Sequence, residues 1–355
     1  MDKIKELQMK MPDTIQAVFI QDGVNRFYFS GMKSSAGTMI ITKTEAIFFI
    51  DFRYIEEAER KVTNCKVVEE TNLYPQIKEW LKERNIQKIS VLTSYITVRK
   101  MNELKNALDT IKVEDSTEAD DIVKKMRCIK DREEIYCHKK AQEITDHVFQ
   151  HICNFIRPGI TELEVAQEIG TMLTRLGSED KHFNFIVASG KNSSLPHGFA
   201  TNKIIENGDF VTMDFGAVYR GRLADMTRTI GVGKIDAQQK EIYEIVKEAQ
   251  KRALDIIKPG VICADVDKAA RDYIYEKGYK GCFSHGLGHS VGIEVHEDPR
   301  FNTICREKLV SGIVITVEPG IYIKGKYGVR IEDMVLVTED GYKNFTKSDK
   351  ELIII

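Results

Sequence analysis

The stretch FVTMDFGAVYRGRLADMTRTIGV, residues 210–232, consists of two apolar segments on either side of Arg220-Gly221. A glycine at a two-residue junction between apolar segments predicts a β-hairpin. If the turn is centred there, Asp214 and Asp225 lie on one face of the hairpin, nearly opposite one another. Two like charges in such a position destabilise a sheet. The pair therefore indicates either a solvated acidic face or a cation site, and the apolar neighbours of both aspartates argue against full exposure.

Two glutamates further along the chain lie in segments that should be buried. Glu318 follows an apolar strand-like segment, and Glu332 lies inside another. A buried carboxylate needs a partner, because an unpaired buried charge is costly. For each glutamate that partner is either a metal ion or an arginine, Arg228 or Arg330.

Three histidines, His285, His289 and His296, lie within one glycine-rich segment, where small neighbours allow a ligand to approach the backbone. A histidine by itself is more often an ordinary polar contact, so the cluster gains weight only from the acids elsewhere. The string GHSVG, residues 288–292, also matches the nucleophile elbow of serine hydrolases. That motif requires strand, turn and helix, with its acid and its histidine later in the chain. Pro299 soon follows and His296 is the last histidine, so this interpretation is disfavoured.

Together these segments offer an oxygen-rich set of ligands with one imidazole. Four carboxylates carry a charge of about −4, which two divalent cations would balance; without cations they would repel, and some would stay protonated. Such a set suits Mn²⁺ or Co²⁺, with Zn²⁺ or Fe²⁺ as alternatives, better than a thiolate-preferring ion. Two such ions would hold a hydroxide between them and polarise a scissile carbonyl. The candidate metal ligands are Asp214, Asp225, His289, Glu318 and Glu332.

Length and composition restrict the class of protein. A chain of 355 residues is long for one core, which predicts two domains. A net charge of −2 gives no electrostatic case for nucleic acid or an anionic membrane. The apolar run 46–50 cannot span a bilayer, and the first residues have no apolar signal core. The seven scattered cysteines include no Cys-x-x-Cys pair, which predicts reduced thiols in a cytoplasmic protein.

The N-terminal part, to about residue 120, is predicted to be mixed α/β. Residues 17–20, 38–42, 46–51 and 88–92 are strand-like, and 54–60 and 76–84 have helical composition. The charged stretch 120–132 is interpreted as the connection between the two halves. Because this part holds no cluster of histidines, cysteines or acids, we expect it to cover a site or to form a dimer contact.

An internal repeat follows, with a shift of 101 residues. A helical pattern over 139–156 ends at a Pro-Gly turn and precedes a second helix over 161–176; the plan recurs from residue 240 to Gly278. Under this shift Val165 falls on Val266 and Gly177 on Gly278. The first copy carries two candidate ligands and the second carries three. We therefore expect the site to lie between two related halves, on a sheet that they share.

Taken together, the segments resemble those of the pita-bread metallopeptidases, the family of proline dipeptidase (prolidase), aminopeptidase P and methionine aminopeptidase. The resemblance is strong over 125–355 and plausible over the rest. It implies an α+β protein, in which a catalytic domain, residues 123–355, has a pseudo-twofold curved antiparallel sheet with covering helices. The remaining residues, 1–122, would form a smaller mixed α/β domain of the creatinase/prolidase type. The matching stretches are 195–198, 213–217, 224–229, 285–289, 294–297, 316–322 and 328–333.

The resemblance also implies a role for each matching residue. Asp214 would be a bidentate ligand of one metal, Asp225 and Glu332 would bridge both ions, and His289 and Glu318 would hold the second. His296 would assist proton transfer. The residues expected to line the substrate site or to support ligands and substrate are His197, His285, Arg330 and Tyr322.

The two-domain length resembles that of the proline-specific branch, which implies a small peptide substrate with proline in the second position. Arg300 stands where prolidases carry an arginine for the free carboxylate of the substrate, which would favour Xaa-Pro dipeptides. An Xaa-Pro aminopeptidase acting on longer peptides remains the alternative. The sequence around 221–224 departs from relatives, which often have Tyr and Ser there, but no ligand is lost.

Two other classes share this fold: a creatinase-like enzyme that needs no metal, and a non-catalytic peptide-binding relative. The complete ligand set argues against both. A homodimer in the cytoplasm is expected from the resemblance, with no nucleic-acid or membrane partner.

Overall fold

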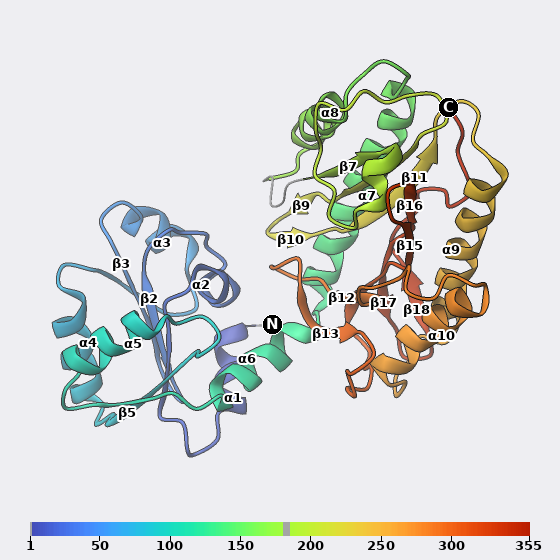
Figure 1. Ribbon diagram of the computed structural model, residues 1–355. Coiled ribbons are helices and arrows are strands. Elements are labelled where there is room, and N and C mark those ends of the chain that lie inside the picture. Colours follow the sequence, from blue (N-terminus) through green and yellow to red (C-terminus); the bar gives the residue numbers. More distant parts are fainter. Residues whose placement is uncertain (1, 180–184) are drawn as a thin grey trace. The chain divides into compact units, whose positions relative to one another are not determined.

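The computed structural model describes residues 2–179 and 185–355, and the chain divides into two compact units, 1–127 and 128–355 (Figure 1). The expected division at 122/123 lies inside helix α6 (Glu118–Cys128). The stretch 120–132, expected to connect the two halves, does contain the boundary between the units, and most of it is helical. The reason is an apolar stripe: Val123 and Met126 are buried on one face of this otherwise charged helix.

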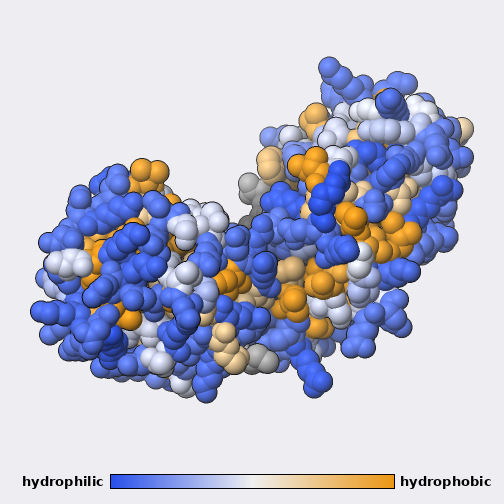
Figure 2. All heavy atoms as spheres, turned by 90° about the horizontal axis from the view of Figure 1, so that it is seen from below, coloured by the Kyte–Doolittle hydropathy of each residue, from blue (hydrophilic) through white to orange (hydrophobic). Residues whose placement is uncertain are grey.

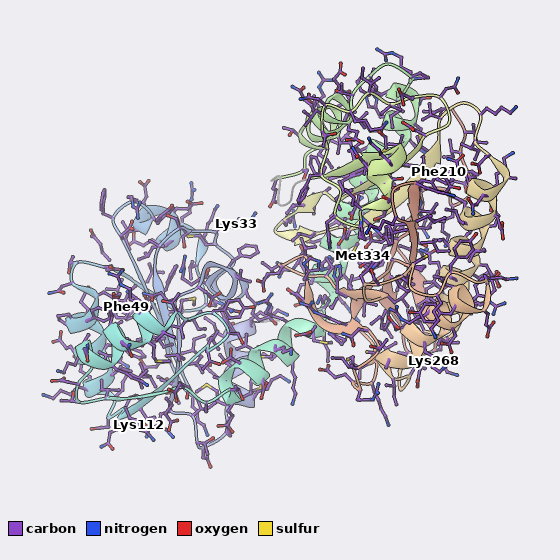
Figure 3. All side chains as sticks on the ribbon, viewed as in Figure 1. Lys33, Phe49, Lys112, Phe210, Lys268 and Met334 are labelled. Atoms are coloured by element: carbon purple, nitrogen blue, oxygen red, sulfur yellow. The ribbon has the colours of Figure 1, made fainter. Side chains whose placement is uncertain are left out.

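Unit 1 is a six-stranded mixed sheet with strand order β4-β3-β2-β1-β5-β6 and helices around it (Figure 1). The predicted strands and helices are confirmed within a few residues. In Figure 3, Phe49 lies among the buried side chains of this unit, whereas the side chain of Lys112 is 72% exposed. The strands are β1 (Ala17–Ile20), β2 (Thr38–Thr42), β3 (Ala46–Ile50), β4 (Lys66–Glu69), β5 (Lys88–Val91) and β6 (Lys112–Glu114), and the other helices are α1 (Lys3–Lys10), α2 (Gly23–Ser30), α3 (Ile55–Lys61), α4 (Leu73–Glu83) and α5 (Val98–Ala107).

Unit 2 contains the two predicted helix pairs, α7 (Arg132–Phe155) with α8 (Glu162–Arg175), and α9 (Ala237–Asp255) with α10 (Cys263–Glu276). The turns that join the helices of each pair have the same geometry. Gly159 and Gly260 have φ angles of 98° and 90°, in the left-handed region that favours glycine. Their N–H groups donate to the carbonyls of Ile205 (2.9 Å) and Leu309 (2.8 Å), so each pair is fastened to its own copy in the same way. These matching contacts support the internal repeat.

The strands of unit 2 form two larger sheets, with orders β11-β8-β7 and β13-β12-β14-β17-β18, so the expectation of one shared sheet was too simple. The two sheets meet at residues 331–332, between β16 and β17, where Glu332 N donates to Thr227 O (3.0 Å). In Figure 1 the helices lie outside these strands. The elements are β7 (Ile186–Ser189), η1 (Gly190–Ser194), β8 (Phe210–Phe215), β9 (Val218–Tyr219), β10 (Arg222–Leu223), β11 (Met226–Gly231), β12 (Gly288–Ser290), β13 (Glu297–Phe301), β14 (Val314–Val317), β15 (Gly320–Ile323), β16 (Tyr327–Arg330), β17 (Asp333–Val337) and β18 (Tyr342–Asn344).

The hairpin at residues 210–232 forms as predicted, with Arg220-Gly221 at its turn, but its register corrects the position of the aspartates. Asp214 is paired with Thr227, and Asp225 lies two residues along, diagonally on the same face. Gly216 allows the two sides of the hairpin to approach closely beside these aspartates, since a Cβ there would lie 1.7 Å from the backbone oxygen of Ala224. The diagonal offset leaves both carboxylates free to face a common cavity.

Unit 2 has two apolar cores, one against α7 and α8 and one against α9 and α10, and each includes residues from both copies. Phe210 and Met334 are fully buried in unit 2, whereas the Lys268 side chain on α10 is 67% exposed (Figure 3). Figure 2 shows a mainly hydrophilic face with small, separated hydrophobic groups. Among the described residues, no helix has the length and apolar character needed to cross a membrane, and all seven cysteines are free thiols.

A buried ion pair joins the two copies. Arg228 in β11 donates to Asp333 in β17 at 2.8 Å, and the two side chains are 1% and 0% exposed. Lys350 Nζ lies 2.8 Å from the other carboxylate oxygen. Burial opposes ionisation of Asp333, but Arg228 and Lys350 outweigh it and keep its pKa below the ordinary value. The pair therefore fixes the junction next to Glu332.

We predict that Asp333→Ala lowers the free energy of unfolding by about 3–5 kcal/mol, because it leaves a buried guanidinium without its partner. Since the pKa of Asp333 is depressed, this contribution is present at neutral pH and is lost as the pH falls through the folded-state value. Thermal unfolding at pH 7 and pH 3 would measure both effects. Asp255→Ala, in the exposed pair with Lys251, is the control and should stay near wild type. Equal shifts in melting temperature for the two variants would contradict the prediction.

Candidate metal centre and active site

A cavity of about 560 Å³ lies within unit 2, and all five candidate metal ligands line it. They come from separate segments: Asp214 from β8, Asp225 from the residue before β11, His289 from β12, and Glu318 and Glu332 from the ends of β14 and β16–β17. The remaining lining residues are Ile186, Pro196, His197, Phe199, His285, Gly286, Gly288, Val295, His296, Arg300, Phe301, Asn302 and Arg330.

Three of the five ligands form a tight group. Ligand atoms of Asp225, His289 and Glu332 all lie within 4.8 Å of one another. His289 Nε2 is 3.7 Å from Asp225 Oδ2 and 3.4 Å from Glu318 Oε1. The carboxylate of Asp214, on the same cavity wall, accepts a hydrogen bond from Arg330 at 2.6 Å.

The arginine alternative for the two glutamates is not what the structure shows. Among the described residues, Arg330 pairs with Asp214 and Arg228 pairs with Asp333. Glu332 accepts a 2.6 Å hydrogen bond from the Thr227 hydroxyl, which is neutral. Among the described residues, therefore, neither Glu318 nor Glu332 forms an ion pair with an arginine.

The electrostatics of the group favour a cation. Burial raises the pKa of Asp225 and of Glu318 well above their ordinary values, and the neighbouring acids, Glu332 first, add to the shift. Burial, and then Asp214, raise the pKa of Glu332 to about 8. Burial also lowers the pKa of His289 to about 3, so its imidazole is neutral and can ligate. These are donors that fit a divalent cation, because such an ion would offset the repulsion that now favours protonation.

A chain of hydrogen bonds links three cavity residues, His285, Arg330 and Asp214, through the hydroxyl of Tyr322. His285 Nε2 lies 2.9 Å from the Tyr322 hydroxyl, and Arg330 donates to that hydroxyl at 2.9 Å and to Asp214 at 2.6 Å. Burial raises the pKa of Tyr322 to about 12, so the hydroxyl stays protonated and donates. Tyr322 does not line the cavity, but its hydroxyl contacts His285 and Arg330, which do.

The other predicted residues also reach the cavity. The rings of His289 and His296 are 4.4 Å apart and nearly perpendicular. Burial, followed by the charge of Arg300, lowers the pKa of His296. Arg300 is paired with His289 across β12 and β13, and its side chain is 52% exposed. His197 also lines the cavity.

Two threonines were missed by the sequence reasoning. Thr227 donates to Glu332 and accepts from Arg330 Nε (3.0 Å), so it links a candidate ligand to the cavity arginine. Thr316 Oγ1 lies 3.4 Å from Glu318 Oε1 and accepts from His289 N. Both could have been found from strand periodicity, since each lies two residues from a candidate ligand and therefore on the same face.

The serine-hydrolase interpretation is excluded by position. Ser290 is 0% exposed within β12, and its hydroxyl donates to Val314 O at 2.8 Å. Strand β13 follows it instead of a helix. The residue is a structural hydroxyl inside the sheet.

Comparison with known proteins agrees with this geometry. Residues 136–339 match metallopeptidase family M24, and residues 3–129 match the creatinase/prolidase N-terminal domain. This chain belongs to metallopeptidase family M24. It is 41% identical to an Xaa-Pro dipeptidase of Pyrococcus furiosus, over 96% of each chain. The expected pita-bread fold with a smaller N-terminal domain is confirmed.

Two solved structures are also similar over nearly their whole length. An Xaa-Pro dipeptidase from Bacillus anthracis has a TM-score of 0.95 at 40% identity, with 99% of each chain covered. An X-Pro aminopeptidase from Thermotoga maritima has a TM-score of 0.92 at 34% identity, covering 99% of this chain and all of that one. The fold is therefore shared by both activities.

We predict that the metal-free protein releases protons when it binds Mn²⁺ at pH 7. Glu332, with a pKa of about 8, is mostly protonated there and must ionise to ligate. Calorimetric titration in two buffers of different ionisation enthalpy would measure the release, and Glu332→Gln should reduce it. The raised pKa of Glu332 also affects the free energy of unfolding of the metal-free protein. Protonated Glu332 contributes its full stabilisation at a pH below the ordinary glutamate pKa, and this stabilisation is lost as the pH rises through about 8. Identical binding enthalpies in both buffers would contradict the prediction.

Proposed function

We propose that this member of metallopeptidase family M24 hydrolyses the Xaa-Pro bond of small peptides, and of dipeptides in particular. The observation that carries the proposal is the gathering of Asp225, His289 and Glu332 within 4.8 Å, in a cavity that Asp214 and Glu318 also line. The similarity to Xaa-Pro dipeptidases over nearly the whole chain supports the choice of bond.

Two divalent cations would be held by the five candidate ligands, with Asp225 and Glu332 shared between them. Mn²⁺ or Co²⁺ suits this oxygen-rich set with one neutral imidazole, and Zn²⁺ or Fe²⁺ is the alternative. When bound, such ions polarise a carbonyl and provide a hydroxide nucleophile at neutral pH. The raised pKa values of the acids and the lowered pKa of His289 support this fit.

The remaining residues bind and orient the peptide. Burial, followed by the charge of Arg300, lowers the pKa of half-buried His296, so its imidazole is neutral at pH 7 and would accept a proton and pass it to the leaving nitrogen. His285 and His197 line the cavity and would contact the carbonyl region of the peptide. Arg330, fixed by Tyr322 and by the carbonyl of Pro196 (2.9 Å), keeps Asp214 in place.

Arg300 is the group proposed to select dipeptides. Its side chain is half exposed at the cavity, and its Nε lies 3.6 Å from Asp298 Oδ1, which is a loose ion pair. A guanidinium can grip a free carboxylate with two parallel hydrogen bonds. Among peptides with proline in the second position, only a dipeptide has its terminal carboxylate on the proline ring. An Xaa-Pro aminopeptidase is the second candidate, which the likeness to the Thermotoga maritima enzyme favours.

The complete ligand set disfavours the metal-free creatinase-like enzyme and the non-catalytic relative. The physiological setting proposed is a cytoplasmic homodimer that acts on small peptides with proline in second position.

The proposal is tested by hydrolysis of Ala-Pro and Gly-Pro by protein loaded with Mn²⁺ or Co²⁺, with and without chelator. Asp225→Asn should abolish activity and lower metal content, because a shared carboxylate is lost. His296→Ala is the matched variant: turnover should fall by about 10²–10⁴-fold while metal content, measured by atomic spectrometry, stays at the wild-type value. A fully active Asp225→Asn protein would refute the ligand assignment.

A further prediction concerns Arg300→Ala. It should raise KM for Ala-Pro at least tenfold, since a charge-assisted pair is worth about 1.5–3 kcal/mol. Hydrolysis of an Xaa-Pro tripeptide amide, which has no carboxylate in that place, should change little. Comparing kcat/KM for the two substrates in both proteins measures the difference. If wild type cleaves dipeptide and tripeptide at equal rates, the aminopeptidase alternative is favoured.

A further inference from the structure

Two cavity histidines lie on loops that occupy equivalent places in the repeat. Under the shift of 101 residues, Ser189 at the end of β7 falls on Ser290 at the end of β12. His197 lies on the loop that follows β7, and His296 lies on the loop that follows β12. Loops have few regular hydrogen bonds, so each needs another means of holding its histidine in place.

Glu162 closes the first of these loops. It is the first residue of α8, it is 0% exposed, and it does not line the cavity. One carboxylate oxygen accepts from Ser189 N (2.6 Å) and Ser189 Oγ (2.8 Å), and the other accepts from Thr201 N (3.0 Å) and Thr201 Oγ1 (2.6 Å). Asn192 Nδ2 donates to both oxygens at 3.2 Å. A single carboxylate therefore joins the start and the end of the loop.

Within residues 2–179 and 185–355, the hydrogen-bond donors to the Glu162 carboxyl group are uncharged groups of Ser189, Asn192 and Thr201. Its position in the first turn of α8 places the charge at the positive end of the helix dipole. Between the two ends, the loop reaches the site: His197 and Phe199 line the cavity, and Pro196 O accepts from Arg330. Any shift of the ends would move this wall.

Glu297 closes the second loop in a similar way. It is 8% exposed, and its Oε1 accepts from Ile293 N (3.0 Å) and Glu294 N (3.3 Å). Its Oε2 is 3.1 Å from the buried amine of Lys130. Gly292 is required beside it, because a Cβ there would lie 2.2 Å from the carboxylate oxygens. The loop that ends at His296 is thus folded around this carboxylate.

We propose that Glu162 and Glu297 are positioning residues that hold His197 and His296 against the substrate. Glu162 does so by joining the two ends of its loop, and Glu297 by accepting the backbone N–H groups of Ile293 and Glu294. Neither carboxylate lines the cavity, so neither acts on the peptide directly. The proposal rests on the proposed peptidase activity. The size of the expected effect comes from the general rule that a misplacement of about 1 Å at a reacting centre can lower the rate about 100-fold.

Glu162→Gln is the informative variant, because its amide nitrogen would face a donor of Ser189 or Thr201 and release one end of the loop. We expect kcat/KM for Ala-Pro to fall about 10- to 100-fold. Amide hydrogen exchange of the metal-free protein should rise in residues 189–201 and stay unchanged elsewhere, and metal content should equal that of wild type. The matched control is Glu164→Gln, in the same turn of α8. Glu164 is exposed and caps the helix by its contact with Thr161, which glutamine can also do, so its kinetics should be unchanged.

A double-mutant cycle separates positioning from general destabilisation. If Glu162 acts through His197, the Glu162→Gln loss should shrink to less than threefold in a His197→Ala background, and the Glu297→Gln loss should shrink likewise in a His296→Ala background. Equal losses in both backgrounds would overturn the proposal. Should Glu162→Gln fail to fold, Thr201→Val removes one donor from the carboxylate and is entered into the same cycle with the same criterion. A wild-type protein that binds metal but leaves Ala-Pro uncleaved would refute the proposed function, while hydrogen exchange would still report on the loop contacts of Glu162.

Discussion

The constraint on which this structure depends is the repulsion among carboxylates that the fold brings together and buries. Asp225, Glu318 and Glu332 have raised pKa values because water is excluded and because each lies near the others. Such an arrangement costs folding free energy unless cations or protons neutralise it. The metal-free protein resolves the conflict with protons, and a metallopeptidase is expected to resolve it with divalent ions.

Both copies of unit 2 contribute ligands to the site where these carboxylates repel one another. The first copy supplies Asp214 and Asp225 on a hairpin, and the second supplies the imidazole and both glutamates. Arg228 and Asp333 join the copies by a buried ion pair next to Glu332. Because the ligands are divided between halves that must meet, formation of the site is coupled to the folding of the whole unit. The electrostatic cost is thereby offset by contacts remote from the cavity.

The two histidines proposed to act on the peptide, His197 and His296, lie on loops, so their positions must be fixed by contacts other than those of a sheet or helix. Glu162 and Glu297 show how a buried carboxylate can replace regular secondary structure, because it accepts backbone N–H groups of a loop that a sheet or helix would otherwise satisfy. One such carboxylate lies behind each histidine, although the two glutamates do not correspond under the shift of 101 residues. The same chemistry, an acid deprived of water, is thus used in the cavity to attract cations and behind it to fix the backbone.

The sequence by itself determined the helix pairs, the hairpin at 210–232, the five candidate ligands and the family, because apolar periodicity, glycine turns and motif residues are local properties. Only the tertiary structure decided that Arg330 pairs with Asp214, that Thr227 holds Glu332, and that the strands separate into two sheets. It also showed that 120–128 continues as a helix, since burial of Val123 and Met126 depends on what packs against them. The role of Glu162 could not be read from the chain at all. Its partners at 189 and 201 are distant in sequence, and nothing local specifies which of many acids will be enclosed by hydrogen-bond donors when the loops close.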